Sequence, residues 1–84
     1  MAQILYFASL AETLGTRSEQ LELPQNCRKV TDLVEVLSAR GEPFASAFGG
    51  DIRILVAINQ EMSAPEAEIE NHDEIAFFPP VTGV

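Results

Sequence analysis

Two segments, one near each end of the chain, constrain the fold most because both are apolar on two faces. Residues 3–8 read Gln-Ile-Leu-Tyr-Phe-Ala and residues 74–78 read Glu-Ile-Ala-Phe-Phe. Aromatic and β-branched residues favour strands, and side chains alternate between the two faces of a sheet. A strand with two apolar faces belongs in the middle of a sheet or against a partner. We therefore expect the two segments to pair in parallel at the centre of one mixed sheet.

Further strands are expected to extend this sheet. Residues 18–23 alternate, with their leucines inward, and end before Pro24, which has no N–H for a sheet ladder. This segment is suited to pair with the first strand. Residues 54–59 form the clearest strand, and the turn Asn59-Gln60-Glu61 leads into a short strand near Met62.

One main helix is expected between the strands. Thr31 is the expected N-cap, Asp32 lies favourably in the first turn, and Gly41 follows the last turn. The apolar residues that would face the core recur at the spacing of a helix face, at Val30, Leu33, Val34 and Leu37.

Two short helices are also expected. The first would start at Ser9 as the N-cap, with Glu12 completing a capping box, and end at Gly15. The second would open at Pro43 and close at the internal diglycine of residues 49–50, which is a turn signal. Strands mixed with few helices predict an α+β domain.

A single main helix covers only one face of such a sheet, so the other face should stay apolar and open. Large exposed apolar surfaces usually mark a partner-binding site. Aromatic and thioether side chains, here Phe7, Met62 and Phe78, are favoured at the centre of interfaces. The alternative is that a loop covers this face. The residues expected on it are Leu5, Phe7, Leu55, Ala57, Ala76 and Phe78, joined by Met62.

The charge balance disfavours two classes of partner. The chain carries 13 acidic against 5 basic residues, a formal net charge of −8. Such a field repels nucleic acids and anionic membranes and favours a basic protein surface, although solubility alone explains acidity equally well. No apolar run approaches the length of a membrane span, and no leader precedes the first strand. We expect a cytoplasmic protein.

The titratable residues give no sign of a catalytic or metal site. One cysteine and one histidine cannot build a zinc site alone, so we expect no metal. Cys27 is expected to be an inert loop thiol; the alternative is a reactive thiol whose pKa is lowered by Arg28 and Lys29. His72 is expected in the last turn with a positive φ, since histidine tolerates left-handed geometry.

The chain ends in a segment that cannot continue a sheet. Pro79 and Pro80 fix φ and offer no N–H. We therefore expect a folded domain over residues 1–78 and an extended tail over residues 79–84. Six extended residues reach about 20 Å, which is enough to deliver a terminal carboxylate into a pocket of another protein.

The run Phe77-Phe78-Pro79-Pro80-Val81-Thr82-Gly83, with the acidic turn and strand before it, resembles the end of molybdopterin synthase small subunits, the MoaD family. The opening Ile4-Leu5-Tyr6-Phe7-Ala8 and the strand Val56-Ala57-Ile58-Asn59-Gln60 extend the resemblance over most of the chain. The family has the β-grasp fold of ubiquitin and ends in Gly-Gly, whereas this chain ends in Gly83-Val84. The family commonly has glycine where this chain has His72.

This resemblance implies a sulfur carrier that does no catalysis by itself. In the family, an activating enzyme adenylates the terminal carboxylate with ATP, and a sulfurtransferase then supplies the sulfur of a thiocarboxylate. Two such carriers insert their tails into a dimeric large subunit and donate sulfur to a pterin precursor; no cofactor is bound to the carrier. The reacting carboxylate would belong to the Gly83-Val84 end. The partner-binding residues would be Phe7, Met62, Phe78, Pro79, Pro80, Val81 and Thr82.

Val84 puts a β-branched side chain beside the reacting carbon, where glycine would leave the carbonyl open. Three interpretations stay open: a variant or engineered end on a normal carrier, an end removed before use that leaves Gly83, or a diverged subunit that binds without carrying sulfur. We favour the first because the rest of the tail matches the family. The alternative functions are a non-carrying ubiquitin-like interaction module and a thiamine-pathway sulfur carrier. The Phe-Phe-Pro-Pro run that leads into the tail argues against the thiamine-pathway carrier.

Overall fold

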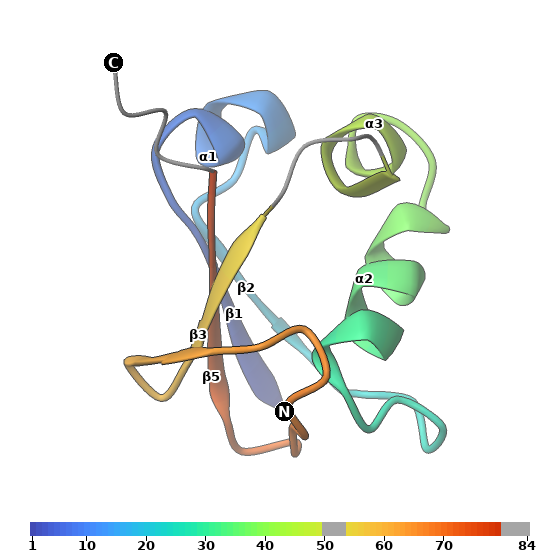
Figure 1. Ribbon diagram of the computed structural model, residues 1–84. Coiled ribbons are helices and arrows are strands. Elements are labelled where there is room, and N and C mark those ends of the chain that lie inside the picture. The colour runs from blue at the N-terminus through green and yellow to red at the C-terminus, as the bar shows by residue number, and fades with distance from the viewer. Residues whose placement is uncertain (50–53, 80–84) are drawn as a thin grey trace.

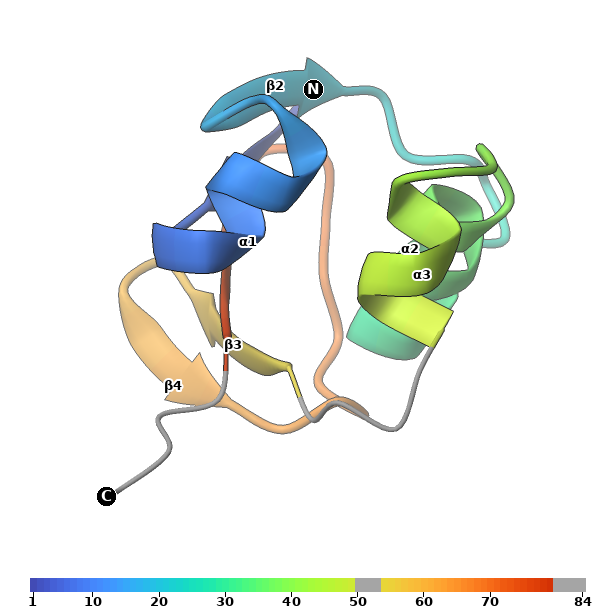
Figure 2. The ribbon, with the colours of Figure 1, turned by 90° about the horizontal axis from the view of Figure 1, so that it is seen from above.

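The computed structural model describes residues 1–49 and 54–79. Within them the strands form one five-stranded sheet in the order β2-β1-β5-β3-β4 (Figure 1). Helices α2 and α3 lie together on one side of the sheet, and α1 lies at one end of it (Figures 1 and 2). The elements in chain order are β1 (Ala2–Tyr6), α1 (Ala8–Leu14), β2 (Ser18–Leu21), α2 (Val30–Ser38), α3 (Phe44–Gly49), β3 (Leu55–Ile58), β4 (Glu61–Ser63) and β5 (Glu74–Phe78).

The first and last strands are parallel neighbours at the centre of the sheet. β1 and β5 pair in register from Gln3↔Glu74 to Tyr6↔Phe77. β2 pairs antiparallel with β1, and β3 pairs antiparallel with β5. The prediction from the two-sided apolar segments is therefore confirmed. With α2 across one face, the arrangement is the expected α+β, β-grasp fold.

The core lies between this sheet and the helices. Ile4, Ile75 and Phe77 from the central strands meet Leu33 and Leu37 of α2, and all five are at most 1% exposed. Val34 packs against the core but is only half-buried. The helical spacing thus located the inner face of α2.

Two predicted helix starts are wrong. Ser9 does not cap α1, because the carbonyl of Phe7 accepts from the N–H groups of Leu10 and Ala11 at 3.2 and 3.4 Å. The N-cap of α1 is therefore Phe7, without a side-chain cap. Gly15 ends α1 as predicted, at φ 75°.

Thr31 is likewise not the N-cap of α2, which is Lys29. The Asp32 carboxylate accepts from the N–H groups of Arg28 and Lys29, both at 3.0 Å. The N–H of Val30 donates to the carbonyl of Ala67 at 3.1 Å. The first turn of α2 is thus closed by its own aspartate and by the segment of residues 64–73.

The predicted turn between β3 and β4 is present at Asn59 and Gln60, whereas Glu61 already begins β4. Asn59 and Gln60 have φ of 51° and 69°. Positive φ at both central residues is the geometry of a type I′ hairpin turn, which matches the twist of the flanking strands. The short strand near Met62 is β4, as expected.

A buried hydroxyl and an ion pair tie the region after α2 to the sheet. The Tyr6 hydroxyl donates to Glu19 Oε2 at 2.9 Å, and both Arg40 Nη atoms donate to the same carboxylate at 2.8 Å. The Arg40 guanidinium lowers the pKa of Glu19 below its ordinary 4.5, against the opposing effect of burial. Burial, followed by the bond to Glu19, raises the pKa of Tyr6.

We expect Glu19→Gln to destabilise the fold by about 1 kcal/mol at pH 7, as for partly exposed bidentate pairs. Because the folded-state pKa of Glu19 is lowered, its stabilising effect is present above 4.5 and is lost as pH falls through that lowered value. Urea unfolding at pH 7 and pH 3 measures this. The exposed Glu22→Gln removes the same charge as a control. The difference between the two variants should be smaller at pH 3 than at pH 7, and an equal difference at both pH values would contradict the assignment.

Candidate partner-binding site

The two faces of the sheet bury their apolar residues in different ways. Those expected to face the helices, such as Val56 and Phe77, all belong to the hydrophobic core or pack against it. Ala57 and Ala76 are also buried, at 5% exposure each, yet neither belongs to that core. The two alanines therefore lie on the other side of the sheet. The apolar residues of that side, here called the apolar face, are Leu5, Phe7, Leu55, Ala57, Met62, Ala76 and Phe78, and none of these residues contributes to the core.

Strand register arranges the apolar face in rows across the sheet. Leu5 is level with Ala76, Ala76 with Ala57, and Ala57 with Met62. In the next row towards the end of β5, Phe78 is level with Leu55. Partnered residues of adjacent strands project to the same face. The alanines thus lie at the middle of a surface whose margins carry larger side chains.

Phe7 and Phe78 form the aromatic part of this surface. Their rings stack with centroids 4.7 Å apart and planes 12° from parallel. The N–H of Phe7 donates to the carbonyl of Phe77 at 3.1 Å. This bond keeps the side chains of Phe7 and Phe78 at the same position along the sheet. Phe7 is 41% exposed and Met62 62% exposed, so both are accessible on the isolated chain.

The long loop of residues 64–73 lies on the side of the sheet opposite to the apolar face. Residues 64–73 run from β4 towards the start of α2 and then return to β5 (Figures 1 and 2). Glu68 forms an isolated antiparallel β-bridge with Lys29 there, through the backbone, and the Ile69 side chain joins the core. Within residues 1–49 and 54–79, no loop covers the apolar face.

A groove of about 710 Å³ adjoins the apolar face beside α1. Leu5 and Phe7 line both the groove and the face, and Glu12 and Arg17 also line the groove. The accessible surface therefore extends beyond the apolar face into a recess that carries one acidic and one basic side chain.

The predicted tail residues are only partly described. Pro79 follows β5 and is half-buried. Pro80, Val81, Thr82, Gly83 and Val84 lie outside the described residues. Of the predicted partner-binding residues, the structure brings Phe7, Met62 and Phe78 onto one face, and that face adjoins the end of β5.

The environment of Cys27 is that of a structural residue. Cys27 is buried, and burial, followed by the nearby Asp32 charge, raises the pKa of its thiol. The thiolate is the nucleophilic form, so the inert thiol is the interpretation that the structure favours over the reactive one.

No helix of the described residues has the length and apolar composition to cross a membrane.

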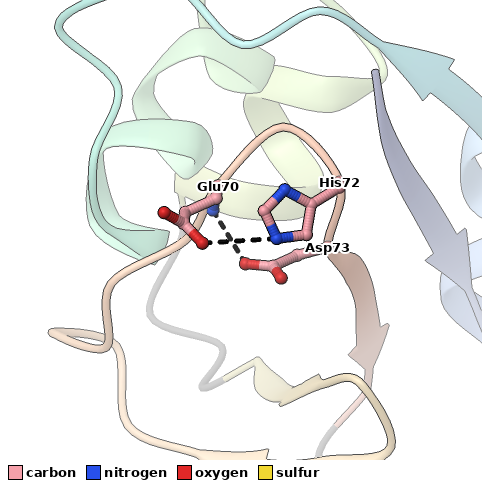
Figure 3. A group of neighbouring side chains, drawn as sticks. All are labelled: Glu70, His72 and Asp73. Atoms are coloured by element: carbon pink, nitrogen blue, oxygen red, sulfur yellow. Dashed lines mark hydrogen bonds and ion pairs between the residues drawn. The ribbon is translucent and has the colours of Figure 1, made fainter.

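His72 lies beside two acids in the turn before β5 (Figure 3). Its Nε2 is 3.3 Å from Glu70 Oε2, and one ligand atom each from Glu70, His72 and Asp73 lie within 4.8 Å of one another. Asp73 is already engaged, because its two oxygens accept from Asn59 Nδ2 at 3.0 Å and from the N–H of Glu70 at 2.7 Å. The prediction of a positive φ at His72 is wrong: the turn closes through these Asp73 bonds without it.

Sequence reasoning listed only the apolar members of the open side. Gln3 is level with Gln20 on β2 and with Glu74 on β5, which makes a third row on the same side. We call Gln3, Gln20 and Glu74 the polar row. The same two-residue alternation that placed Ala76 and Phe78 would have located Glu74.

Comparison with known proteins gives consistent matches over almost the whole chain. The ThiS family model matches residues 4–83. The molybdopterin synthase sulfur carrier subunit of Haemophilus influenzae is 40% identical over 83 residues, covering 99% of each chain. The Escherichia coli subunit of the same name is 34% identical over 83 residues, again covering 99% of each. A Pyrococcus furiosus structure assigned as molybdopterin converting factor, subunit 1, is 29% identical with a TM-score of 0.72, covering 95% of this chain and 97% of that one.

Proposed function

Because this chain belongs to the ThiS family, among the molybdopterin synthase sulfur carrier subunits, we propose that it delivers sulfur on its terminal carboxylate to a pterin precursor. The observation that carries the proposal is the match to these carriers from end to end. The apolar face adds a docking surface next to the strand from which the tail continues.

The proposed chemistry needs two activation steps. A carboxylate is a poor electrophile, so an activating enzyme first transfers AMP from ATP to it and releases pyrophosphate. A sulfur nucleophile then attacks the acyl carbon, AMP leaves, and a thiocarboxylate remains. The carrier supplies the acyl group and its position; the activating enzyme and the large subunit supply the catalytic groups.

The folded domain supports this division of labour. Among the described residues the cysteine is buried and the histidine is an exposed turn residue beside Glu70. Neither forms a nucleophile–base pair of the kind that catalysis requires. A domain that presents an apolar face beside the strand leading to its tail is suited to docking and delivery.

Intact mass measurement tests the proposal directly. The chain is incubated with the activating enzyme, ATP and a sulfur source, and a carrier gains the mass difference between sulfur and oxygen. No gain, together with tight binding to the large subunit, would instead identify a non-carrying interaction module.

Phe78→Ala should weaken binding to the large subunit by more than about 1–2 kcal/mol, the cost of truncating an interface anchor. The domain should stay folded because Phe78 lies outside the core. Calorimetric titration of the large subunit measures the affinity, and circular dichroism the fold.

Phe44→Ala is the matched control for this experiment. Phe44 is also a half-buried phenylalanine, but it packs against the core from α3. Its truncation should cost stability and leave affinity unchanged. If Phe78→Ala unfolds the domain while the remaining folded molecules bind normally, Phe78 is a core residue and the docking surface is wrong.

A further inference from the structure

The side of the sheet that carries the apolar face also carries one charged side chain in its three rows. The register places Gln20, Gln3 and Glu74 across one row, and Ser18, Leu5, Ala76, Ala57 and Met62 across the next. The third row holds Phe78 and Leu55, with Phe7 stacked on Phe78. Glu74 is therefore the single charge in these rows, at the end of β5 opposite Phe78.

The backbone at Glu74 is fixed by the neighbouring hairpin. Its N–H donates to Asn59 Oδ1 at 3.0 Å, and its carbonyl accepts from the Asn59 N–H at 2.7 Å. Asn59 Nδ2 in turn donates to the buried Asp73 at 3.0 Å. These bonds fix the backbone from which the Glu74 side chain projects, so a partner has to order only the side-chain rotamers.

Glu74 is half-buried as a residue, and its carboxylate has no hydrogen-bond or salt-bridge partner among the described residues. A protein that covers the apolar face would also remove water from this group. Burying a carboxylate without a counter-charge is strongly unfavourable, whereas a hydrogen-bonded cation offsets much of that cost. The chain itself carries a net charge of −8, so a second copy is a poor source of the cation.

We propose that Glu74 pairs with a lysine or arginine side chain of the large subunit and fixes how the apolar face is oriented on it. This inference rests on the proposed function. Phe78 is four positions after Glu74 along β5, so the cation lies about 13 Å from the site that receives the Phe78 ring. The ion pair at Glu74 and the apolar contact at Phe78 differ in chemistry, so together they fix the orientation of the domain on its partner. The apolar face alone would not.

The test compares charge changes on the two sides of the sheet. Glu74→Gln and Glu74→Lys are measured beside Glu35→Gln and Glu35→Lys, because Glu35 is an exposed acid on α2. Dissociation constants for the large subunit are determined from about 0.05 to 0.5 M salt, with thermal unfolding of each variant as a folding control.

Glu74→Gln should raise the dissociation constant about tenfold near physiological salt and flatten its salt dependence, and Glu74→Lys should raise it about a hundredfold. The Glu35 variants should stay within about twofold of the unmodified chain. Equal effects at the two positions would overturn the inference, because net charge alone would then explain them. Normal binding by Glu74→Gln together with loss of binding by Phe78→Ala would overturn the inference and leave the proposed docking surface standing. An unmodified chain that does not bind the large subunit would overturn both.

Discussion

Leu37→Ala should destabilise the domain by about 2–5 kcal/mol, the range for a leucine truncated in a well-packed core. Leu37 is 0% exposed and packs from α2 against the sheet. A domain of this length typically has a total stability of about 4–13 kcal/mol. The single change should therefore lower the unfolding midpoint strongly or abolish cooperative folding.

Val34→Ala provides the comparison on the same helix. Val34 belongs to the same apolar stripe but is only half-buried, so its truncation removes fewer buried atoms. Urea unfolding followed by circular dichroism measures both variants. Equal losses at the two positions would contradict the packing described for α2.

The parts of the fold that depend on periodicity could be predicted from the sequence. Apolar residues on both faces of residues 74–78 required a central strand, and the spacing from Val30 to Leu37 defined the inner face of the main helix. These patterns are statements about burial, and burial supplies most of the free energy that selects the topology.

The helix starts could not be predicted because contacts distant in sequence decide them. Ser9 and Glu12 match a capping-box pattern, but the carbonyl of Phe7 begins the helix while its N–H still bonds to Phe77. The N–H groups of Val30 and Thr31 bond to carbonyls of Ala67 and Pro65. A local sequence signature cannot include a donor or acceptor that arrives from another part of the chain.

The candidate site was predictable only in its apolar half. Large apolar side chains such as Phe7 and Phe78 can be recognised as interface candidates from the sequence. Nothing in the sequence distinguishes Glu74 among the 13 acidic residues, and only the strand register places it on the side of the apolar face. His72 shows the opposite error. A turn residue of a type that tolerates positive φ was assigned that geometry, but the hydrogen bonds of Asp73 made it unnecessary.

Val84→Gly should accelerate thiocarboxylate formation on the order of 100-fold, the effect of correcting a misplaced reacting group by about 1 Å. Valine places a β-branched side chain next to the carbon that must be adenylated and then attacked by sulfur. Glycine has no Cβ, so it passes through a narrow channel and leaves the carbonyl open from both sides. The chain that ends in Gly83-Val84 should therefore be a slow substrate of the activating enzyme.

The same substitution should change affinity for the large subunit very little. Docking is proposed to depend on the apolar face and on residues 79–81, whereas the acyl chemistry depends on the last two residues. A single-turnover loading assay, followed by intact mass, is run on both forms beside a binding titration of each. The unfolding free energies of the two forms should be equal, which excludes a difference in folded fraction.

Each measurement can contradict this separation of docking from chemistry in its own way. Equal loading rates would show that the activating enzyme does not require a terminal glycine. A large gain in affinity on Val84→Gly would show that the tail end, rather than the apolar face, drives assembly. A chain that binds normally and loads slowly until Val84 is replaced would instead show that the last residue of the tail limits sulfur loading without limiting docking.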